Sequence, residues 1–300
     1  MLKFLVLGAA GYVARKHIEA IFKTNNTVSV IIDENESIGY IDQYFPKALY
    51  FKSIKNFDTF LLKKNISIDY CVICTPNYLH FDHIKFAIKK KYKVICEKPL
   101  TINYSNVDKL IKLEKKGLSI NTILQLRYNQ SLKNLKKNIN DKKKYLVDLT
   151  YISPRGDWYK KSWKGKINKS GGIIFNLGIH FIDIIIWLFG DIIKIEVDTK
   201  TENTISGKFI FMNAEVKWFI SYDPKNISKK GKFNYYRKMI VNNKIIDLSD
   251  NFNNLHIKSY KQILDKKGIS VSEVKQSIYI AKKIQNMKLT RKKQKIIHSL

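Results

Sequence analysis

A lysine in a reactive setting lies at Lys98, in the sequence Cys96-Glu97-Lys98-Pro99. The apolar run before it predicts a strand, and Pro99 keeps Lys98 away from helical backbone angles. A lysine at the end of a strand can polarise a hydroxyl group or, when it is desolvated, remove the proton from that group. Lys98 is therefore our first candidate for a catalytic residue; a surface lysine beside a turn proline is the alternative.

A second candidate, His180, belongs to a polar stripe on an otherwise apolar segment. Asn176, His180, Asp183 and Trp187 are spaced 0, 4, 7 and 11, which places them on one face of a helix. Since an unpaired buried polar group costs about 1–3 kcal/mol, the stripe must meet partners. We predict that His180 is catalytic, with Asp183 as its orienter, and that Asn176 orients substrate or bonds to His180. A histidine satisfied within the core is the alternative.

Cations and aromatic rings gather in the segment before this stripe. An arginine such as Arg155 can bind a carboxylate or a phosphate group through two parallel hydrogen bonds. We therefore expect an anionic substrate here, and a solvated basic loop is the alternative. The predicted substrate-binding residues are Lys98, Arg155, Tyr159, Lys160, Lys164, Asn176 and His180.

A glycine turn follows the first apolar run of the chain. Gly8 and Gly11 have the spacing GxxGxxA, which allows a tight turn and the close approach of a diphosphate. The helix after the turn presents its N-terminal N–H groups to the phosphates. Asp33 ends the second apolar run, where a carboxylate accepts the ribose hydroxyls of adenosine and repels a 2′-phosphate, so we predict NAD rather than NADP. An ordinary strand–turn–helix with an incidental aspartate is the alternative.

Further cofactor ligands are predicted after the other strands of this half of the chain. Loops at the carboxyl ends of parallel strands form the ligand crevice of an open sheet. We expect Asn77, Glu97 and Lys98 to converge near the nicotinamide, and Gln125 and Arg127 to leave the last strand toward the crevice. The predicted cofactor residues of this half are Gly8, Gly11, Tyr12, Val13, Asp33, Thr75, Pro76, Asn77, His80, Glu97, Lys98 and Gln125.

These residues need elements that bring them together. Up to residue 124, continuous apolar runs alternate with amphipathic segments, which predicts a doubly wound parallel α/β sheet, a Rossmann domain. From residue 125 to 300, strand-like segments surround one apolar helix, which predicts an α+β domain with a mainly antiparallel open sheet. We expect domain 1–124 to bind NAD and domain 125–300 to bind substrate. The predicted strands are 4–7, 27–32, 70–74, 93–96, 119–124, 146–153, 193–199, 204–212, 215–221 and 237–241, and the predicted helices are 13–23, 54–64, 79–90, 105–116, 132–139, 174–189, 257–264 and 271–287, before a frayed basic tail at 290–300.

Composition narrows the class of protein. The 300 residues include 55 Lys and Arg against 25 Asp and Glu, a net charge of +30. The lysines are spread along the chain, which favours a solvated surface over nucleic-acid binding. Attraction of an anionic ligand is the second interpretation of this charge. Three cysteines fit a reducing cytoplasm, and no spacing of His and Cys indicates a metal site. The apolar stretch 172–190 contains Asn176, His180 and Asp183, so we do not expect it in a membrane.

The sequences CTPNYLH and CEKPL resemble the Gfo/Idh/MocA oxidoreductase family. The resemblance implies that the lysine of EKP, Lys98, and the histidine of the segment GIH, His180, are catalytic. It also implies that Trp163 touches the cofactor. Many members carry aspartate where this chain has Asn176, and asparagine cannot accept a proton, so an Asp–His relay through this position is not expected.

Longer stretches, among them GAAGYVARKH, DLTYISPRGDWYKKSWKG and NLGIHFIDIIIWLFG, resemble the 3-dehydrogenases of this family that act on UDP-N-acetyl-2-amino-2-deoxyglucuronate. The resemblance implies NAD-dependent oxidation of the C3 hydroxyl in surface-polysaccharide synthesis, with His180 as base and Lys98 polarising the hydroxyl, or the reverse. It implies 2-oxoglutarate as the acceptor that regenerates NAD, and a homotetramer or homodimer formed through the second domain. The alternatives are a family dehydrogenase for another sugar or polyol, and a non-catalytic NAD-binding regulator.

Overall fold

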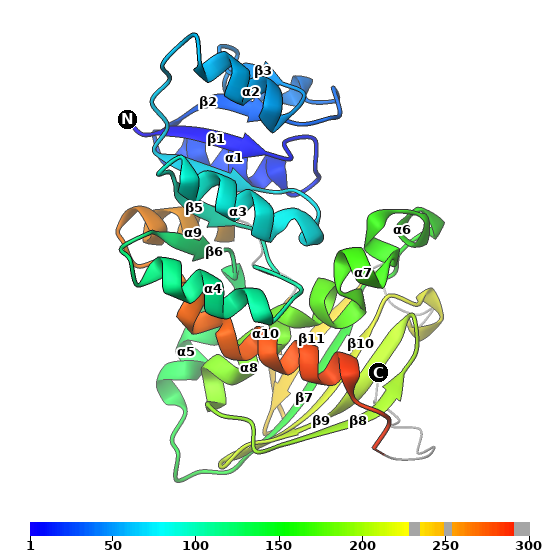
Figure 1. The fold of residues 1–300 in the computed structure, drawn as a ribbon. Coiled ribbons are helices and arrows are strands. Elements are labelled where there is room, and N and C mark those ends of the chain that lie inside the picture. Colours follow the sequence, from blue (N-terminus) through cyan, green and yellow to red (C-terminus); the bar gives the residue numbers. More distant parts are fainter. Residues whose placement is uncertain (228–234, 249–253, 291–300) are drawn as a thin grey trace. The chain divides into compact units, whose positions relative to one another are not determined.

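The computed structural model describes residues 1–227, 235–248 and 254–290. Most of the basic tail expected at the C-terminus, from residue 291 on, lies outside the described residues. Figure 1 shows the course of the chain through two compact units, each of which is built around its own six-stranded sheet.

The two units do not divide the chain at a single point. Unit 1 contains residues 1–125 and 254–275, and unit 2 contains residues 126–253 and 276–300. The chain therefore leaves unit 1, builds the sheet of unit 2, and returns. The helix expected at 257–264 was assigned to the second domain from the sequence, and in the structure it belongs to unit 1.

The sheet of unit 1 is parallel throughout, with the strand order β3-β2-β1-β4-β5-β6. The order of the chain reverses between β1 and β4, and ligands bind open α/β sheets at such a reversal, outside the carboxyl ends of the strands. The predicted Rossmann sheet is confirmed, and β3 is a strand that the sequence analysis missed. The strands are β1 Lys3–Leu7, β2 Thr27–Ile32, β3 Leu49–Phe51, β4 Tyr70–Ile73, β5 Lys93–Cys96 and β6 Ile120–Thr122; the helices are α1 Ala14–Lys23, η1 Gly39–Gln43, α2 Ile54–Leu61, η2 Asn77–Leu79, α3 His80–Lys89, α4 Ser105–Glu114 and α9 Leu255–Leu264.

Burial explains why these segments form a parallel sheet. All of β4 and the last four residues of β1 are buried, as expected for strands covered on both faces. Helix α1 turns Ala14, Ile18 and Ile21 to the core at helical spacing. The returning α9 adds Tyr260, whose fully buried ring lies 6.2 Å from the ring of Phe4. Helix α9 is thus part of the core of unit 1.

The sheet of unit 2 has the order β12-β11-β7-β10-β9-β8. Its neighbouring strands are antiparallel except β7 and β10, which run parallel, so the predicted mainly antiparallel sheet is confirmed. Strand β12 and the short helices α6 and α7 were not predicted. The strands are β7 Tyr145–Ile152, β8 Lys194–Lys200, β9 Thr204–Ile210, β10 Ala214–Ser221, β11 Tyr236–Val241 and β12 Lys244–Asp247; the helices are η3 Gln125–Tyr128, α5 Gln130–Asn138, α6 Asp157–Lys161, η4 Trp163–Gly165, α7 Ile167–Ser170, η5 Ile174–Gly178, α8 Ile179–Phe189, η6 Pro224–Asn226 and α10 Val271–Asn286, which begins in unit 1 and continues into unit 2.

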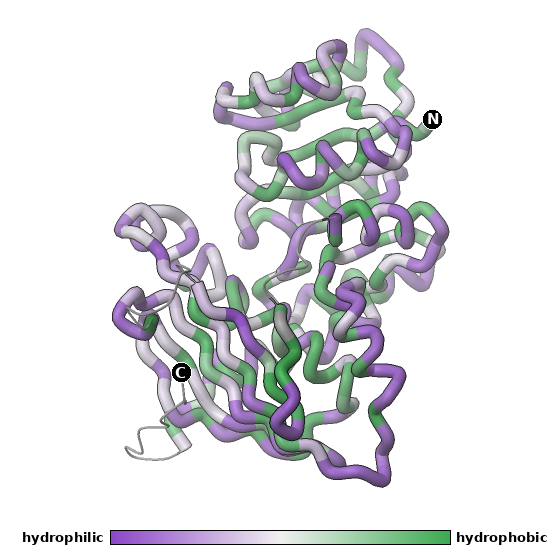
Figure 2. Tube along the Cα trace, turned by 180° about the vertical axis from the view of Figure 1, so that it is seen from behind, coloured by the Kyte–Doolittle hydropathy of each residue, from purple (hydrophilic) through white to green (hydrophobic). Residues whose placement is uncertain are grey.

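The core of unit 2 forms where α8 packs on the sheet. Phe181, Ile182 and Ile185 line one small apolar gap together with Leu149 and Trp218. Figure 2 shows hydrophobic stretches along the strands and hydrophilic ones along the outer helix turns and loops. Among the described residues, one helical stretch, Ile167–Phe189, is long and apolar enough to cross a membrane, but 78% of its most apolar window is buried, as in a core helix.

Candidate active site

The glycine turn of unit 1 is fixed by a close approach of two loops. Gly8 follows β1 with a φ of +81°, a conformation that side chains rarely adopt. A Cβ atom on Gly8 would lie 2.7 Å from the backbone nitrogen of Thr75, in the loop after β4. The Gly11 N–H donates to the Gly8 carbonyl at 3.2 Å and closes the turn. Glycine at position 8 therefore lets the predicted cofactor loops of β1 and β4 meet.

The helix after this turn is suited to bind a diphosphate. Helix α1 begins at Ala14, and its N-cap, Val13, supplies no side-chain acceptor to the first turn. That turn contains no acidic residue, and Tyr12 before it is 82% exposed. A helix N-terminus of this kind offers N–H donors and a positive partial charge to an anion.

Asp33 lies beside the glycine turn, at the carboxyl end of β2. Its Oδ2 accepts the Ala10 N–H at 2.8 Å, and its Oδ1 accepts the Asn35 N–H at 2.8 Å. Each carboxylate oxygen can accept a second hydrogen bond, which leaves capacity for two ribose hydroxyls. The turn, the helix N-terminus and this oriented carboxylate fit NAD.

Two histidines of α3 contact the loop after β4 through Thr75. His80 is buried, with Nδ1 at 2.7 Å from the Pro99 carbonyl oxygen and Nε2 at 2.8 Å from the Thr75 carbonyl oxygen. His83 Nδ1 lies 2.9 Å from the hydroxyl of Thr75. Both ring nitrogens of His80 therefore lie within hydrogen-bond distance of backbone carbonyls, one in each loop, and the cofactor contact predicted for His80 stays a prediction. Asn77, also predicted to bind the cofactor, is buried at the start of η2.

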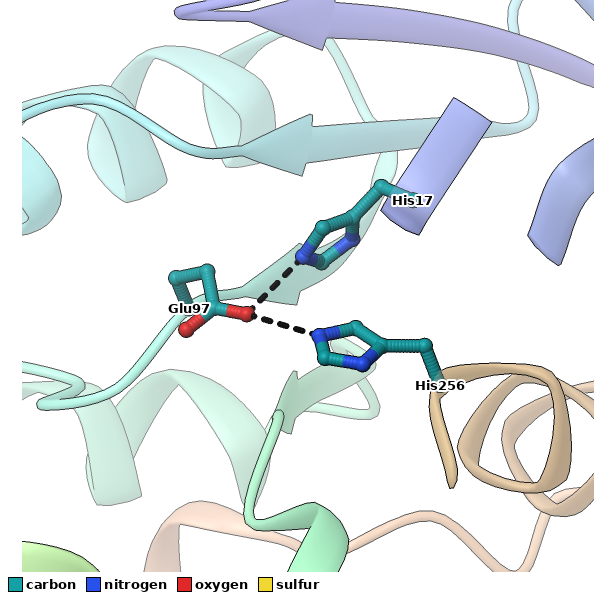
Figure 3. Close-up of side chains that lie close together, drawn as sticks. All are labelled: His17, Glu97 and His256. Atoms are coloured by element: carbon teal, nitrogen blue, oxygen red, sulfur yellow. Dashed lines mark hydrogen bonds and ion pairs between the residues drawn. The ribbon is translucent and has the colours of Figure 1, made fainter. Parts of the chain in front are cut away.

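Lys98 is half-buried, and the peptide bond between Lys98 and Pro99 is cis. The Lys98 N–H donates to Oε2 of Glu97 at 3.1 Å. Glu97 is 6% exposed, and its Oε1 lies 2.9 Å from His17 Nε2 and 3.3 Å from His256 Nε2 (Figure 3). These two histidines hold the pKa of the Glu97 carboxyl well below its usual range, against the effect of burial.

The sequence analysis missed this cluster, which places the Glu97 carboxylate against two helices. The signals were His17 on the apolar face of α1, three residues after Ala14, and His256 four residues before the buried Tyr260. Glu97 is 80 residues from His17 and 159 residues from His256 in the chain. Neither spacing indicates a contact over such a distance in sequence.

In unit 2, three of the predicted substrate residues lie together. The Asn176 amide donates to the Tyr159 hydroxyl at 2.5 Å, and burial raises the pKa of Tyr159 to about 12. Tyr159 and Lys164 line a cavity of about 530 Å³, whose wall also includes Tyr222. The Lys164 ammonium lies 5.6 Å from the ring centre of Trp163, which is half-buried in η4.

The wall of this cavity carries two lysines, Lys164 and Lys200, and one carboxylate, Glu202, and the charge of Arg155 acts on Lys164. Arg155 is half-buried, and its backbone N–H donates to the backbone carbonyl of Tyr222 at 3.2 Å. Burial lowers the pKa of Lys164, and the positive charge of Arg155 lowers it further. Two cations this close repel each other, and a bound anion relieves that repulsion. Lys160, in contrast, is exposed on α6 and does not line the cavity.

The polar stripe differs from the expected single helix face. Asn176 lies in the π-helical η5, and half-buried His180 follows in the first turn of α8. Asp183 is 1% exposed and accepts both Arg127 Nε at 2.8 Å and an outer Arg127 nitrogen at 2.7 Å, and the Ser277 hydroxyl at 3.0 Å. Asp183 and Arg127 thus form a buried ion pair, and the roles predicted for them, as orienter of His180 and as a crevice residue, stay predictions.

Two further residues predicted to bind the cofactor lie in loops of unit 1. Pro76 and Gln125 lie in the loops that follow β4 and β6, and Gln125 is half-buried at the start of η3. Lys98 belongs to unit 1 and His180 to unit 2, so their joint action on one substrate is a prediction about the two units together.

A Rossmann unit with this turn, helix and carboxylate, joined to an α/β unit with a largely antiparallel sheet, defines an NAD-binding oxidoreductase. Residues 2–121 match the oxidoreductase family, NAD-binding Rossmann fold, and residues 135–265 match the oxidoreductase family, C-terminal alpha/beta domain. The chain belongs to the Gfo/Idh/MocA oxidoreductase family.

The chain is also similar to several individual dehydrogenases. The WlbA (WbpB) dehydrogenase from Thermus thermophilus, solved with NAD and UDP-GlcNAcA and also with NAD and alpha-ketoglutarate, is 32% identical with a TM-score of 0.92, over 98% of this chain and 97% of that one. The WlbA dehydrogenase from Bordetella pertussis is 19% identical with a TM-score of 0.76, over 93% and 92% of the two chains, and shows the shared fold. Glucose-6-phosphate 3-dehydrogenase from Bacillus subtilis is 26% identical over 69% of this chain and 60% of its own length.

Proposed function

We propose that this protein oxidises the C3 hydroxyl of UDP-N-acetyl-2-amino-2-deoxyglucuronate to the ketone with NAD. Unit 1 binds the cofactor and unit 2 contributes most of the substrate site. The similarity to the Thermus thermophilus dehydrogenase, which extends over nearly the whole of both chains, is the observation that supports this substrate.

The residues of unit 2 suit such a substrate. A UDP-uronic acid carries a diphosphate and a carboxylate, which suit Lys164 and Lys200 in the cavity wall and Arg155, whose charge acts on Lys164. Tyr159 and Asn176 add a hydroxyl and an amide that are already held by each other and can bond to sugar hydroxyls. We expect the carboxylate to meet Arg155 because a guanidinium binds carboxylates through two bonds.

The chemistry needs a base, a polarising cation and a hydride acceptor. We assign His180 as the base and Lys98 as the group that orients the hydroxyl and stabilises the alkoxide as it forms. The two roles can be exchanged, since a desolvated lysine also serves as a base. NAD, when bound, supplies the hydride acceptor.

We infer three further properties from the same relatives. 2-Oxoglutarate is the second substrate that reoxidises NADH, because the Thermus protein was crystallised with it. The protein works in the cytoplasm, where its three buried free cysteines stay reduced. It forms a homotetramer or a homodimer through unit 2.

One experiment tests the reaction. The purified protein is incubated with UDP-N-acetyl-2-amino-2-deoxyglucuronate and NAD, with and without 2-oxoglutarate, and the sugar is analysed by mass spectrometry. We expect a product lighter by two hydrogen atoms. The amount of product should exceed the amount of NAD supplied only when 2-oxoglutarate is present. An unchanged sugar, together with oxidation of a different sugar, would contradict the proposed substrate.

The second candidate is a dehydrogenase for another phosphorylated sugar or a polyol. The match to glucose-6-phosphate 3-dehydrogenase favours it, because that enzyme also acts at a C3 position and its substrate also carries a phosphate. Glucose 6-phosphate and myo-inositol therefore belong in the same assay. A non-catalytic regulator would bind NAD and oxidise none of the three.

A further inference from the structure

Three buried histidines from three different helices meet the residues on either side of Lys98. His17 in α1, His80 in α3 and His256 in α9 are each at most 5% exposed. His17 and His256 contact Glu97, which precedes Lys98, and His80 contacts Pro99, which follows it. All of these residues belong to unit 1, and none of the three histidines takes part in the proposed chemistry.

On the Glu97 side, the hydrogen bonds form a chain with one consistent direction. The ionised Glu97 carboxylate can only accept, and burial lowers the pKa of His17, so the neutral His17 ring has its proton on Nε2 and its Nδ1 accepts from the Tyr260 hydroxyl at 2.8 Å. The Nε2–H of His17 donates to Glu97 Oε1 at 2.9 Å. Because the ionised Glu97 carboxylate can only accept, His256 Nε2 also donates to it, at 3.3 Å.

This chain ends at the backbone of Lys98. Glu97 Oε2, the oxygen that faces away from the two histidines, accepts the Lys98 N–H at 3.1 Å. The Glu97 side chain is therefore fixed at three points, by α1, by α9 and by the peptide unit that leads into Lys98. Figure 3 shows the carboxylate of Glu97 directed toward the two imidazole rings.

On the Pro99 side, His80 lies between two backbone carbonyls. Its ring nitrogens are 2.7 Å from the Pro99 oxygen and 2.8 Å from the Thr75 oxygen. A neutral imidazole donates to only one carbonyl at a time, whereas an imidazolium donates to both. The pKa of His80 is lowered, chiefly by burial and also by the charge of Lys98, although the two carbonyls and the charge of Glu97 act in the opposite direction. A hydrogen bond to both loops at once therefore requires the protonated ring, and the neutral ring bonds to one of the two loops.

The Glu97 cluster also has the composition of a metal site. The candidate ligand atoms of His17, Glu97 and His256 lie within 4.8 Å of one another. Against this, the carboxylate already accepts from three N–H groups, and the outer nitrogen of His17 is taken by Tyr260. A metal ion would have to replace the two histidine bonds to Glu97, so the observed contacts favour the hydrogen-bonded network.

We propose that His17, His80 and His256 are positioning residues for Lys98: by fixing Glu97 and Pro99 they set the place and direction of the Lys98 amine. The inference rests on the proposed role of Lys98 in catalysis. The three helices that supply these histidines are separated in sequence, so the position of Lys98 depends on the complete packing of unit 1.

The test compares truncation with replacement by glutamine, whose side-chain amide can donate from nearly the place of an imidazole Nε2. For His256→Ala and His17→Ala we expect kcat to fall about 10- to 100-fold, because a misplacement of about 1 Å can cost a hundredfold. The KM for NAD should change by less than about threefold, since the glycine turn and Asp33 do not contact these histidines. His256→Gln and His17→Gln should recover most of kcat.

Matched controls separate positioning from a general loss of stability. Ile263→Ala in α9 and Ile18→Ala in α1 each truncate a buried apolar side chain in the same helices, at a cost of about 2–5 kcal/mol, which is close to that of removing a partner of a buried charge. Their melting temperatures should fall about as much as those of the histidine variants, with kcat close to that of the wild type. If the histidine→Ala variants keep kcat within about twofold of these controls, the histidines are structural only and the proposal is wrong.

A second measurement does not depend on the substrate. Lysines are labelled with pyridoxal phosphate and borohydride, and the modification of Lys98 is followed by peptide mass spectrometry, with exposed Lys93 as the internal reference. We expect His256→Ala to change the labelling rate of Lys98 severalfold and that of Lys93 hardly at all. An unchanged Lys98 rate overturns the positioning role even if the proposed substrate is wrong, whereas a changed rate in a protein without turnover leaves it standing and contradicts only the proposed function.

Metal analysis gives the remaining outcome. We expect the purified protein to contain no stoichiometric zinc and titration with Zn²⁺ to leave the NMR shifts of His17 and His256 unchanged. Stoichiometric zinc that is lost in His256→Ala would identify a metal site and overturn the hydrogen-bonded network.

Discussion

Replacement of Asp33 by serine is the sharpest test of how unit 1 selects its cofactor. The Asp33 carboxylate is held toward the glycine turn by the Ala10 N–H and the Asn35 N–H, each at 2.8 Å. This geometry leaves one acceptor position on each oxygen for the ribose of adenosine. A serine at this position keeps a short polar side chain but removes the charge and one of the two acceptors.

The expected effect has two parts. Hydrogen bonds to a charged group contribute about 1.5–3 kcal/mol each, so loss of the ribose contacts should weaken NAD by about 2–3 kcal/mol, or roughly 30- to 150-fold. For NADP, the repulsion between the carboxylate and the 2′-phosphate disappears. Two unit charges at about 4 Å repel by about 1 kcal/mol in water and about 4 kcal/mol in a partly shielded site, and half-buried Asp33 lies between these cases.

Together these parts predict that the preference for NAD over NADP falls roughly a thousandfold. The assay is titration of wild type and Asp33→Ser with each cofactor, by calorimetry or by quenching of tryptophan fluorescence. Glu34→Ser is the matched control, because it removes the same charge from the next, exposed residue. A change in the ratio of the two dissociation constants that is below about threefold, or no larger than that of Glu34→Ser, would refute the ribose role of Asp33.

Three further predictions concern the substrate site and the frame of unit 2. Lys98→Ala and His180→Ala should each abolish turnover, while NAD binds within a few fold of wild type in calorimetry; near wild-type rates in both variants would contradict their assignment. Arg155→Ala should raise the substrate KM more than it lowers kcat in steady-state assays, since Arg155 is assigned to ground-state binding, and equal losses in both would indicate a transition-state role. Arg127→Ala should destabilise the protein by about 3–5 kcal/mol in urea unfolding, because it removes the arginine that pairs with the buried Asp183 carboxylate. The double variant Arg127→Met/Asp183→Leu should recover most of this loss. A loss below about 1 kcal/mol in the single variant would show that the pair is dispensable.

The sequence predicted the parts of the fold that follow from local patterns. The apolar runs of β1, β4 and β5 indicate strands that are buried on both faces, and their alternation with helices indicates a parallel sheet. Strand β3 was missed because its apolar run, Leu49–Phe51, is only three residues long and lies partly exposed at the sheet edge. The π-helical η5 was missed because one extra residue per turn leaves no mark in an apolar sequence.

The candidate site was predictable where its motifs lie directly after strands. The placement of Gly8, Asp33 and the residues before Lys98 follows from the rule that loops at carboxyl strand ends form the site. The partner of Asp183 could not be predicted, because an aspartate on a helix indicates only that a partner exists. Arg127 reaches it across 56 residues of sequence, and such pairs depend on the tertiary fold.

The return of α9 to unit 1 has a consequence for how this chain can fold during synthesis. The sheet of unit 1 is translated first, yet the aromatic ring that fills its interior, Tyr260, leaves the ribosome only after the strands of unit 2. Until then the nascent N-terminal part has an uncovered apolar face and lacks the hydroxyl that bonds to Nδ1 of His17. A gene fragment that stops at residue 125 would therefore encode an unfinished cofactor domain, because residues 254–275 complete unit 1.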